Sequence, residues 1–295
     1  MTIRIDSHLH LFASTKSEYR RGVHPLYPEE REALIGNFIT VMDENSIDHA
    51  VLVSLDDHDD YAAAAREEFP ERFSLVGVMN SDAHDLAKDF ESRNEKSNYL
   101  GFRVWELGDL TSPIRKLKSF EMLKSMSEAG VIAWFYSTSE QQELLPKVLQ
   151  ELPDLKVVLN HLGFCQSGWD VDAWGRPRIE TPIPPPSWKY VKDLAASPNV
   201  SVLFSGQYAF SNDEFPYQDM RGMSADLLEW YGVERLMWAS DWPWIDQRPG
   251  YKSLSELPAL HFPNMTSEDL QKIMGENAAR IFSLKNVKAR DGKAL

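Results

Sequence analysis

The sequence predicts a single (β/α)8 barrel, and three observations lead to that prediction. Eight short runs rich in aliphatic and aromatic residues alternate with stretches of helical periodicity along the 295 residues. Most of these runs are apolar without alternation, as parallel strands buried on both faces are. No linker, repeat or break in composition divides the chain. The alternative is a doubly wound open sheet, which usually has fewer strands and often a glycine-rich phosphate loop after the first, a loop missing from this sequence.

The first predicted strand runs from Ile3 to His10 and alternates polar with apolar residues between Arg4 and Leu9. Residues two apart on a strand face the same side, so His8 and His10 present two imidazoles in one direction, about 6–7 Å apart. Two such rings can converge on one metal ion or on one polarised oxygen.

Seven further strands are predicted from apolar runs, over residues 50–55, 74–79, 100–104, 131–136, 156–161, 200–204 and 235–241. Between them, helical spacing predicts helices over residues 29–45, 57–69, 84–95, 119–129, 140–151, 188–196 and 223–231, with one or two closing helices over 267–282. Gly130 is placed to end its helix, as a C-terminal glycine does. We expect the barrel to occupy residues 1–284 and a charged, loosely ordered tail to occupy 285–295.

Composition and charge restrict the class of protein. The hydrophobic fraction of 43% is sufficient for a large core, and no apolar run approaches the roughly 18 residues of a membrane span. The N-terminus lacks the layout of a secretory signal. Cys165 is the single cysteine, which rules out an intrachain disulfide and a thiolate metal cluster. The formal net charge of -14 argues against a nucleic-acid partner. We therefore expect a cytoplasmic protein that acts on a small molecule, with no nucleic-acid or membrane partner; a homo-oligomer remains open.

Polar residues gather at the predicted strand ends. The chemistry of such barrels sits at the carboxyl ends of the strands, and there Arg103, Tyr136, His161 and Asp241 join the two histidines of the first strand. Three imidazoles and a carboxylate falling independently at strand ends are unlikely to be a coincidence, so these positions are the candidate site.

These residues also carry a resemblance. Asp6–His10, Asn160–Gly163 and Ala239–Pro243 stand in the order and spacing of the amidohydrolase superfamily, and Gly275–Phe282 is similar to the closing helix of its amidohydrolase-related branch, also called amidohydrolase family 2. The resemblance covers nearly the whole chain. It implies the barrel fold and, for most members, hydrolysis, while the substrate is not set by the scaffold motifs.

One departure from the family pattern concerns the metal. Metal-dependent members carry a ligand, usually histidine, at the end of the fifth strand, six residues after a glycine, whereas here Gly130 leads to Tyr136. A neutral phenol is a poor metal ligand because its pKa lies near 10. A tyrosine at this place resembles the lactonase group, which includes sugar-lactone and 2-pyrone-4,6-dicarboxylate lactonases, some of which need no metal. We therefore expect no strictly required cofactor, with His8, His10 and Asp241 left as a weak site for one divalent ion such as zinc.

The chemistry of ester hydrolysis assigns roles to the same residues. It needs a base that deprotonates water and donors for the developing oxyanion. Asp241 is the best candidate for the base, because it stands at a strand end beside imidazoles that stabilise its anion. The three histidines are expected to polarise the carbonyl oxygen, and Tyr136 to donate to the substrate.

Loop residues are the candidates for substrate recognition. A guanidinium fork suits a carboxylate, and five arginines are expected on the catalytic face, with the first and last nearest to a strand end: Arg103, Arg176, Arg178, Arg221 and Arg248. An aromatic wall could be built from Trp169, Trp174, Trp242 and Trp244. The remaining histidines are interpreted as surface or core residues: His24, His49, His58, His84 and His261.

The sequence thus favours a hydrolase that opens the lactone of a small carboxylated or polyhydroxylated molecule. Two alternatives remain. One is a metal-dependent decarboxylase or hydratase of an unsaturated or aromatic acid, which the missing fifth-strand ligand disfavours. The other is a barrel that binds a small molecule without turnover. The loop over residues 163–187, rich in Trp, Pro and Arg, is expected to set specificity, with the proline-rich run from Pro182 to Pro186 as its stiff part.

Overall fold

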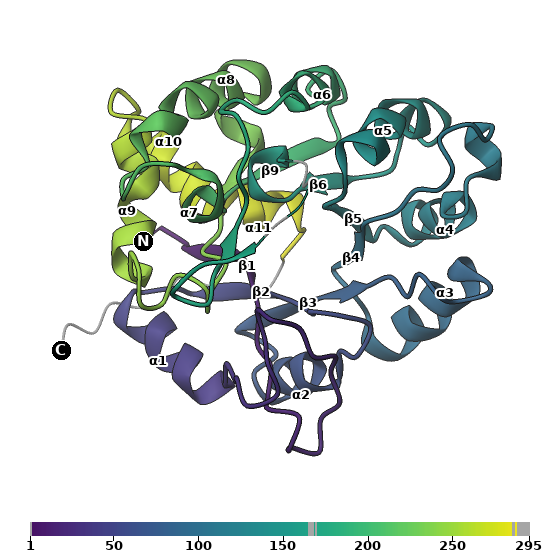
Figure 1. The fold of residues 1–295 in the computed structure, drawn as a ribbon, viewed down its shortest axis with the longest axis horizontal. Helices are drawn as coiled ribbons and strands as arrows, with labels where there is room; N and C mark the ends of the chain where they lie inside the picture. Colours follow the sequence, from purple (N-terminus) through teal and green to yellow (C-terminus); the bar gives the residue numbers. More distant parts are fainter. Residues whose placement is uncertain (1, 165–167, 169, 285–286, 288–295) are drawn as a thin grey trace.

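The computed structural model describes residues 2–164, 168, 170–284 and 287. Its centre is an eight-stranded parallel sheet (Figure 1) in the order β1, β2, β3, β4, β5, β6, β9, β10. The strands are β1 (Ile5–Leu9), β2 (His49–Val53), β3 (Phe73–Val78), β4 (Gly101–Val104), β5 (Ile132–Phe135), β6 (Val157–Leu159), β9 (Val200–Phe204) and β10 (Leu236–Trp238). Each pairs with its neighbour in parallel. The predicted (β/α)8 barrel is confirmed.

Helices follow the strands and surround the sheet in chain order (Figure 1). They are α1 (Ile35–Glu44), α2 (Asp60–Glu68), α3 (Leu86–Ser97), α4 (Phe120–Ala129), α5 (Ser139–Glu151), α6 (Trp188–Leu194), α7 (Gln207–Phe210), α8 (Arg221–Tyr231), α9 (Tyr251–His261), α10 (Ser267–Gln271) and α11 (Asn277–Ile281). Short 3₁₀ turns cover Ile114–Lys116, His161–Gly163, Gln218–Met220 and Val233–Arg235, and a π-helical turn covers Lys272–Glu276. As predicted, α4 ends at Gly130, which has a φ of 71°.

Several predicted boundaries need correction. The first helix begins at Ile35 and not at Glu29, because Ala33 exchanges two backbone hydrogen bonds with Phe12 and is therefore extended. Helices α7 and α9 were not predicted, and the long sixth loop contains a small hairpin of β7 (Asp170–Val171) and β8 (Pro177–Arg178). The predicted tail lies outside the described residues, apart from Val287. The division into a barrel over 1–284 and a tail stays a prediction.

The two ends of the sheet are joined by the residues that follow β10. Asp241 N donates to His8 O (2.9 Å), and His10 N donates to Trp242 O (2.8 Å). Below them, the carboxylate of Asp6 accepts from the backbone N and the hydroxyl of Ser240 (2.8 and 2.5 Å) and from the hydroxyl of Tyr251 (2.8 Å). The seam between β10 and β1 therefore places Asp241 beside the histidines of β1.

A register shift in β1 decides which way its side chains face. Asp6 pairs with Ala50 and Leu9 with Leu52, so one extra residue stands in β1 between these pairs. Ile5 belongs to the cluster inside the barrel, whereas Leu9 packs in the layer between barrel and helices. A regular strand would put Ile5 and Leu9 on one face. The bulge removes that constraint and turns His8 towards the interior, where Trp134 contacts it.

The amino-terminal end of the barrel is covered by the closing helices. Ala278 and Phe282 pack into the interior cluster with Ile5, and the ring of Phe282 lies 5.4 Å from that of Trp134. Gly275 permits this approach, because a Cβ there would come within 2.2 Å of Ile3 O. This end is therefore filled, and the carboxyl end is left for a site.

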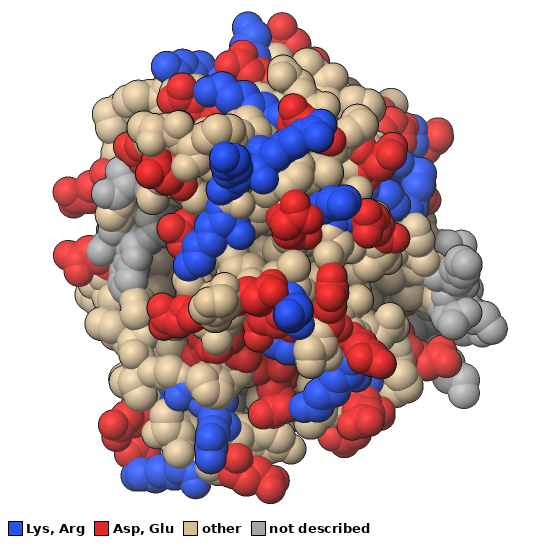
Figure 2. All heavy atoms as spheres, turned by 90° about the vertical axis from the view of Figure 1, so that its right-hand side faces the viewer, with Lys and Arg blue, Asp and Glu red and all other residues tan. Residues whose placement is uncertain are grey.

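The outer surface is highly charged. On the face that lies at the right of Figure 1, acidic and basic side chains are interspersed (Figure 2), as on an ordinary solvated surface. Among the described residues, no helix combines the length and the apolar character that crossing a membrane requires.

Candidate active site

A pocket of about 240 Å³ opens at the carboxyl ends of the strands. It is lined by loop residues that follow β1, β2, β4, β5, β6 and β10, together with residues of the β8 hairpin. His10, Arg103, Tyr136, His161 and Asp241 all line it. Sequence positions that are far apart therefore meet at one mouth.

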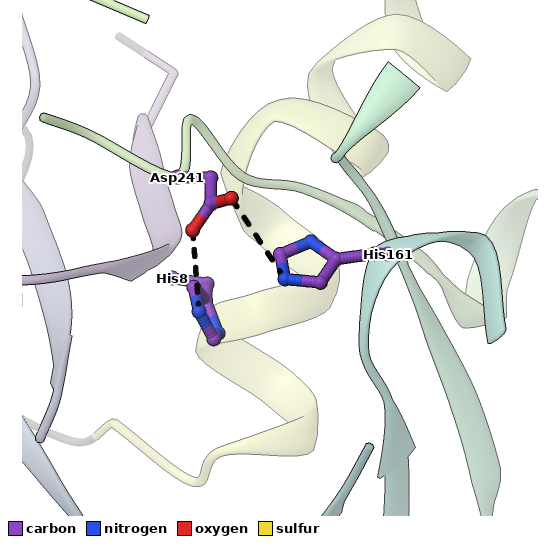
Figure 3. Close-up of side chains that lie close together, drawn as sticks. All are labelled: His8, His161 and Asp241. Carbon is purple, nitrogen blue, oxygen red and sulfur yellow. Dashed lines mark ion pairs between the residues drawn. The ribbon is translucent and has the colours of Figure 1, made fainter. Parts of the chain in front are cut away.

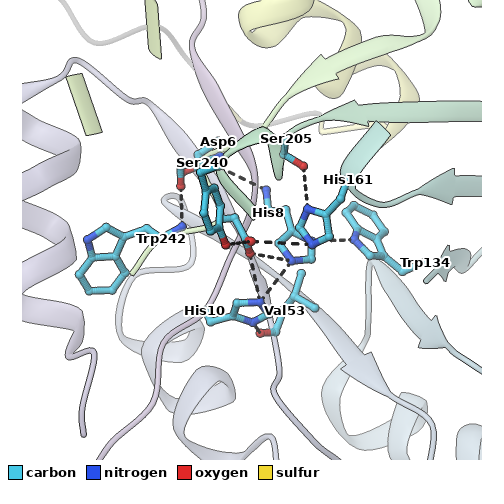
Figure 4. A network of polar contacts seen from close by, with 11 residues as sticks. Asp6, His8, His10, Val53, Trp134, His161, Ser205, Ser240 and Trp242 are labelled. Atoms are coloured by element: carbon cyan, nitrogen blue, oxygen red, sulfur yellow. Dashed lines mark hydrogen bonds and ion pairs between the residues drawn. The ribbon is translucent and has the colours of Figure 1, made fainter. Parts of the chain in front are cut away.

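Three imidazoles surround the carboxylate of Asp241. Figure 3 shows this carboxylate beside His8 and His161, and Figure 4 shows His10 next to His8. Its Oδ1 lies 3.5 Å from His8 Nε2 and 3.4 Å from His10 Nε2, and its Oδ2 lies 3.8 Å from His161 Nε2. All four side chains are buried. Tyr136 stands edge-on to His161, with the ring centroids 5.2 Å apart.

Two of these residues have left-handed backbones. The φ angles are 46° at His161 and 60° at Asp241, a conformation that costs an L-residue roughly 1–2 kcal/mol. His161 is also closely approached by Gly206, where a Cβ would lie 2.7 Å from that of the histidine. Strained backbone conformations of this kind concentrate at functional sites. Here the left-handed conformation directs the side chains of His161 and Asp241 into the mouth.

The protonation states favour a base among neutral rings. Burial and the neighbouring His10 lower the pKa of His8 well below its usual value, against the opposing pull of Asp241. Burial likewise lowers the pKa of His161 to about 4. Burial alone would raise the pKa of Asp241, but the imidazoles of His161, His10 and His8 outweigh it and hold that pKa below its ordinary value. Near pH 7, Asp241 is ionised and His8 and His161 are neutral.

The two oxygens of Asp241 differ in their partners. The hydroxyl of Tyr208, on α7, donates to Oδ2 (2.6 Å). Oδ1 is buried and has no hydrogen-bond partner among the described residues. A buried carboxylate oxygen without a donor is costly, so this oxygen is available to accept a proton.

Arg103 is a second group without a partner. Its side chain is 7% exposed, and its guanidinium lies over the rings of Trp105 (5.0 Å) and Tyr136 (5.1 Å). It makes no hydrogen bond or ion pair with a side chain among the described residues, and its Nε is buried without a partner. Burial lowers the pKa of Arg103, while Tyr136 and Asp241 oppose that shift. The pocket thus holds a buried cation that an anionic ligand could neutralise.

The other predicted arginines lie elsewhere. Arg176, Arg178 and Arg248 line a neighbouring pocket of about 330 Å³ beyond Tyr208. Arg176 pairs with Asp172 (2.8 Å), Arg248 pairs with Glu214 (2.5 Å), and Arg178 donates to Ser211 O and Asn212. The fifth, Arg221, lies on α8 and donates to Leu260 O.

The predicted aromatic wall is only partly placed around the catalytic pocket. Trp244 lines it. Trp242 does not, because it follows Asp241 and points away, with its ring 5.0 Å from that of Phe38 on α1 and its Nε1 donating to Asp246. Trp174 lines the neighbouring pocket, and Trp169 lies outside the described residues.

Several site residues were missed by the sequence analysis. His24, interpreted there as a surface or core residue, lines the catalytic pocket and stacks on Tyr27. Tyr208 comes from a helix of only four residues that no periodicity signals. Trp134 was taken as part of an apolar strand, yet its Nε1 donates to His8 Nδ1 (3.0 Å). A polar tip on an otherwise apolar ring is the one signal that could have singled out Trp134 and Tyr208.

The protein is thus a (β/α)8 barrel with three histidines and a buried aspartate at its mouth. This places it in the class of barrels that carry imidazoles and a carboxylate at the ends of their strands. The chain belongs to the amidohydrolase family, whose model matches residues 5–284. It is 24% identical over 292 residues to a 4-sulfomuconolactone hydrolase from Rhizobium radiobacter, covering 95% of this chain and 89% of the relative.

Solved structures share the fold. A protein from Pseudomonas putida, provisionally assigned as a 2-pyrone-4,6-dicarboxylic acid hydrolase, superposes with a TM-score of 0.73 at 20% identity, covering 97% of this chain and 99% of the other. An amidohydrolase from Burkholderia multivorans, with bound zinc, superposes with a TM-score of 0.69 at 20% identity, covering 95% and 99%.

A candidate site for a divalent metal such as zinc is also present here. His8, His161 and Asp241 each offer one ligand atom, all within 4.8 Å of one another; His161 takes the place that the sequence analysis gave to His10. Two of these ligands fit a metal. Oδ1 of Asp241 accepts no hydrogen bond from the described residues. The Nδ1 of His161 lies 3.0 Å from the hydroxyl of Ser205, which can accept a hydrogen bond from Nδ1–H and so leave the lone pair on Nε2. The third, His8, does not fit in this arrangement. Its Nδ1 accepts a hydrogen bond from Trp134, so the proton of the neutral ring is on Nε2, the nitrogen that faces the other two ligands.

Proposed function

We propose that the protein hydrolyses a lactone of a small carboxylated molecule, with Asp241 as the base that activates water. The observation that carries the proposal is Oδ1 of Asp241, a buried carboxylate oxygen at the pocket that lies among imidazoles and accepts no hydrogen bond from any residue that the structure describes. Named lactone hydrolases among the relatives support the same reaction class.

The proposed reaction follows from the two oxygens of Asp241. Tyr208 donates to Oδ2 and fixes the carboxylate, so Oδ1 can take a proton from a water molecule placed in the pocket. That water attacks the lactone carbonyl carbon, and the ring C–O bond then breaks. The alkoxide that leaves is protonated by the proton that Asp241 has accepted, and the base is restored.

The developing oxyanion needs hydrogen-bond donors that are already in place. Neutral His8 can supply its Nε2–H, and neutral His161 can supply an Nε2–H when the hydroxyl of Ser205 donates to its Nδ1. Tyr136 supplies a hydroxyl at the same mouth. Because His8 and His161 are buried and Tyr136 is half-buried at the end of a barrel strand, little reorganisation would accompany the reaction.

Arg103 is the reason for proposing that the substrate carries a carboxylate. A buried guanidinium without a partner is expensive, and a substrate carboxylate would give it a charge-assisted pair. The flanking rings of Trp105 and Tyr136 leave the fork facing a pocket of about 240 Å³. That volume lies below the roughly 300–1,000 Å³ of pockets for drug-sized ligands, so a molecule of one small ring fits best.

Paired substrates test the proposal. Lactones that carry a carboxylate are compared with their primary amides, which have the same size but no charge, by following acid release at constant pH. We expect turnover of at least one carboxylated lactone, with kcat/KM higher by roughly 10-fold or more, the worth of one charge-assisted hydrogen bond. Equal turnover of acid and amide would remove the role of Arg103. Release of carbon dioxide from aromatic acids, or binding without turnover, would overturn the hydrolase.

A further inference from the structure

Trp134 holds one nitrogen of His8. The tryptophan is fully buried on β5, its ring stacks against His8 with an interplanar angle of 24°, and its Nε1 lies 3.0 Å from His8 Nδ1 (Figure 4). An indole N–H can only donate a hydrogen bond. His8 Nδ1 must therefore be the nitrogen without a proton, and neutral His8 carries its proton on Nε2.

The other side of His8 agrees with this assignment. His10 Nδ1 lies 2.7 Å from Val53 O, and a carbonyl can only accept, so His10 carries a proton on Nδ1. The Nδ1–H tautomer of His10 presents a lone pair at Nε2. His8 Nε2 lies 3.3 Å from that nitrogen. The pair is a hydrogen bond only if His8 supplies the proton. The donations from Trp134 to His8 and from His10 to Val53 are therefore fixed by groups that have one role each, and donation from His8 to His10 is the direction that agrees with both.

We propose that Trp134 is a positioning residue that keeps His8 a hydrogen-bond donor at Nε2 and so withholds it from a metal ion. A histidine binds a metal through the lone pair of a neutral ring and usually donates its other N–H to an acceptor. In this protein Nδ1 of His8 accepts a hydrogen bond from Trp134. Binding a metal through Nε2 would therefore require a lone pair on both nitrogens, and a neutral imidazole has only one. His8, His161 and Asp241 are placed as the ligands of a zinc ion would be, but His8 has no free lone pair with which to bind the metal.

The same geometry gives His8 a task in the metal-free site. Its Nε2–H lies 3.5 Å from Asp241 Oδ1, at the point where water and substrate would meet under the proposed function. A fixed donor there complements a substrate oxygen. The assignment itself does not need that function, because it can be measured through nitrogen shifts and bound zinc.

The first test reads the tautomer directly. Histidine is labelled with ¹⁵N in the zinc-free protein near pH 7, and the His8 signals are identified by their loss in His8→Gln. We expect a protonated Nε2 and an unprotonated Nδ1 in the wild-type protein, and a different or mixed state in Trp134→Phe, which keeps the stacked ring but removes the donor. A wild-type His8 that carries its proton on Nδ1 would overturn the proposal, whether or not the Phe variant folds.

The second test reads the metal. Zinc is titrated into the chelator-treated protein, and affinity is measured by calorimetry. Trp134→Phe should bind zinc at least about tenfold more tightly than the wild type, the scale on which partners of metal ligands change affinity. The matched control is Trp238→Phe, which removes an equally buried indole N–H that donates to Leu254 O (3.3 Å) and leaves His8 untouched. Equal affinities in the wild type and Trp134→Phe, or the same gain in the control, would contradict the role of Trp134.

Discussion

At the amino-terminal end of the barrel, His49 and Arg235 have hydrogen-bond partners for their nitrogens. At the carboxyl end, Arg103 Nε and Oδ1 of Asp241 have no hydrogen-bond partner in the part of the chain that the structure describes. His49 contacts Glu71 O (3.1 Å) and the hydroxyl of Ser74 (2.9 Å). Arg235 donates to backbone carbonyls of five residues, at Tyr231, Ser197, Val200, Ala195 and Trp230.

The difference shows that burial of a charged side chain does not by itself mark a site. Buried His49 and half-buried Arg235 at the closed end stabilise the fold, since their hydrogen bonds join segments of the chain. At the mouth, Asp241 Oδ1 and Arg103 Nε are buried, and no hydrogen bond from the described residues offsets the free-energy cost of their burial. This separation of a stabilising end from an active end is typical of (β/α)8 barrels. Variants at the two ends of the barrel would test this separation.

Asp241→Asn should lower kcat by about 10²–10⁴-fold, the usual contribution of a general base. Asparagine tolerates the left-handed backbone at this position and can still accept from Tyr208, so the fold should be kept. KM should change little, because the lost proton acceptor acts in the transition state. Steady-state kinetics on a responsive lactone decide. A variant with more than about a tenth of the wild-type rate would move the base elsewhere, to His161 first.

Arg103→Gln should raise KM for a carboxylated lactone by roughly 10–100-fold, the worth of a charge-assisted hydrogen bond of about 1.5–3 kcal/mol. Its free energy of unfolding should be equal to or higher than that of the wild type, because a buried charge without a partner is removed. Kinetics and urea unfolding together measure both effects.

Arg235→Gln is the control from the other end of the barrel. It leaves several carbonyls without donors, so it should lower the free energy of unfolding and leave KM unchanged. If Arg103→Gln were the destabilising variant and Arg235→Gln the kinetic one, the comparison of the two ends would be reversed.

The pH dependence of the free energy of unfolding tests the buried histidine at the amino-terminal end, His49. Burial lowers the pKa of His49 from 6.5 to about 4. Unfolded His49 takes up a proton near pH 6.5 and folded His49 only near pH 4, so its contribution is complete above pH 6.5 and is lost as the pH falls towards 4. By pH 5 this loss amounts to about 2 kcal/mol. His161 is shifted in the same direction, whereas burial raises the pKa of Asp6 to about 6, which adds stability as the pH falls below 6.

His49→Gln should therefore lose about 2 kcal/mol less than the wild type between pH 7 and pH 5, while its activity at pH 7 is kept. Urea unfolding at the two pH values is the measurement, with activity assayed alongside. An unchanged pH dependence would show that His49 is already charged in the folded protein.

Arg248→Gln should have the smallest effect. Its guanidinium is partly exposed and pairs with Glu214 outside the catalytic pocket, and such surface pairs contribute about 0–1 kcal/mol. We expect KM for the small lactone to change by less than about fivefold. A larger rise would mean that the substrate reaches past Tyr208 into the neighbouring pocket, as the sequence analysis first expected for this arginine.

The barrel could be predicted from the sequence alone, and so could most of the residues that line the candidate site. The eight apolar runs, the ends of those runs at His8, Arg103 and His161, and the glycine that ends α4 are local patterns, set by periodicities of two and 3.6 residues that need no knowledge of the rest of the chain. Asp241 was found in the same way, although its strand ends three residues earlier, at Trp238.

Tertiary structure alone decided what each of these side chains meets. The bulge that turns His8 inward depends on its pairing with β2, and the proton on His8 depends on Trp134, 126 residues away. Tyr208 reaches Asp241 only because the segment after β9 folds back over the mouth. Of the arginines, all suited to a carboxylate, Arg103 is the one on the catalytic pocket that is left without a partner among the described residues. Side-chain direction and hydrogen-bond role are properties of contacts between distant segments, which no local pattern contains.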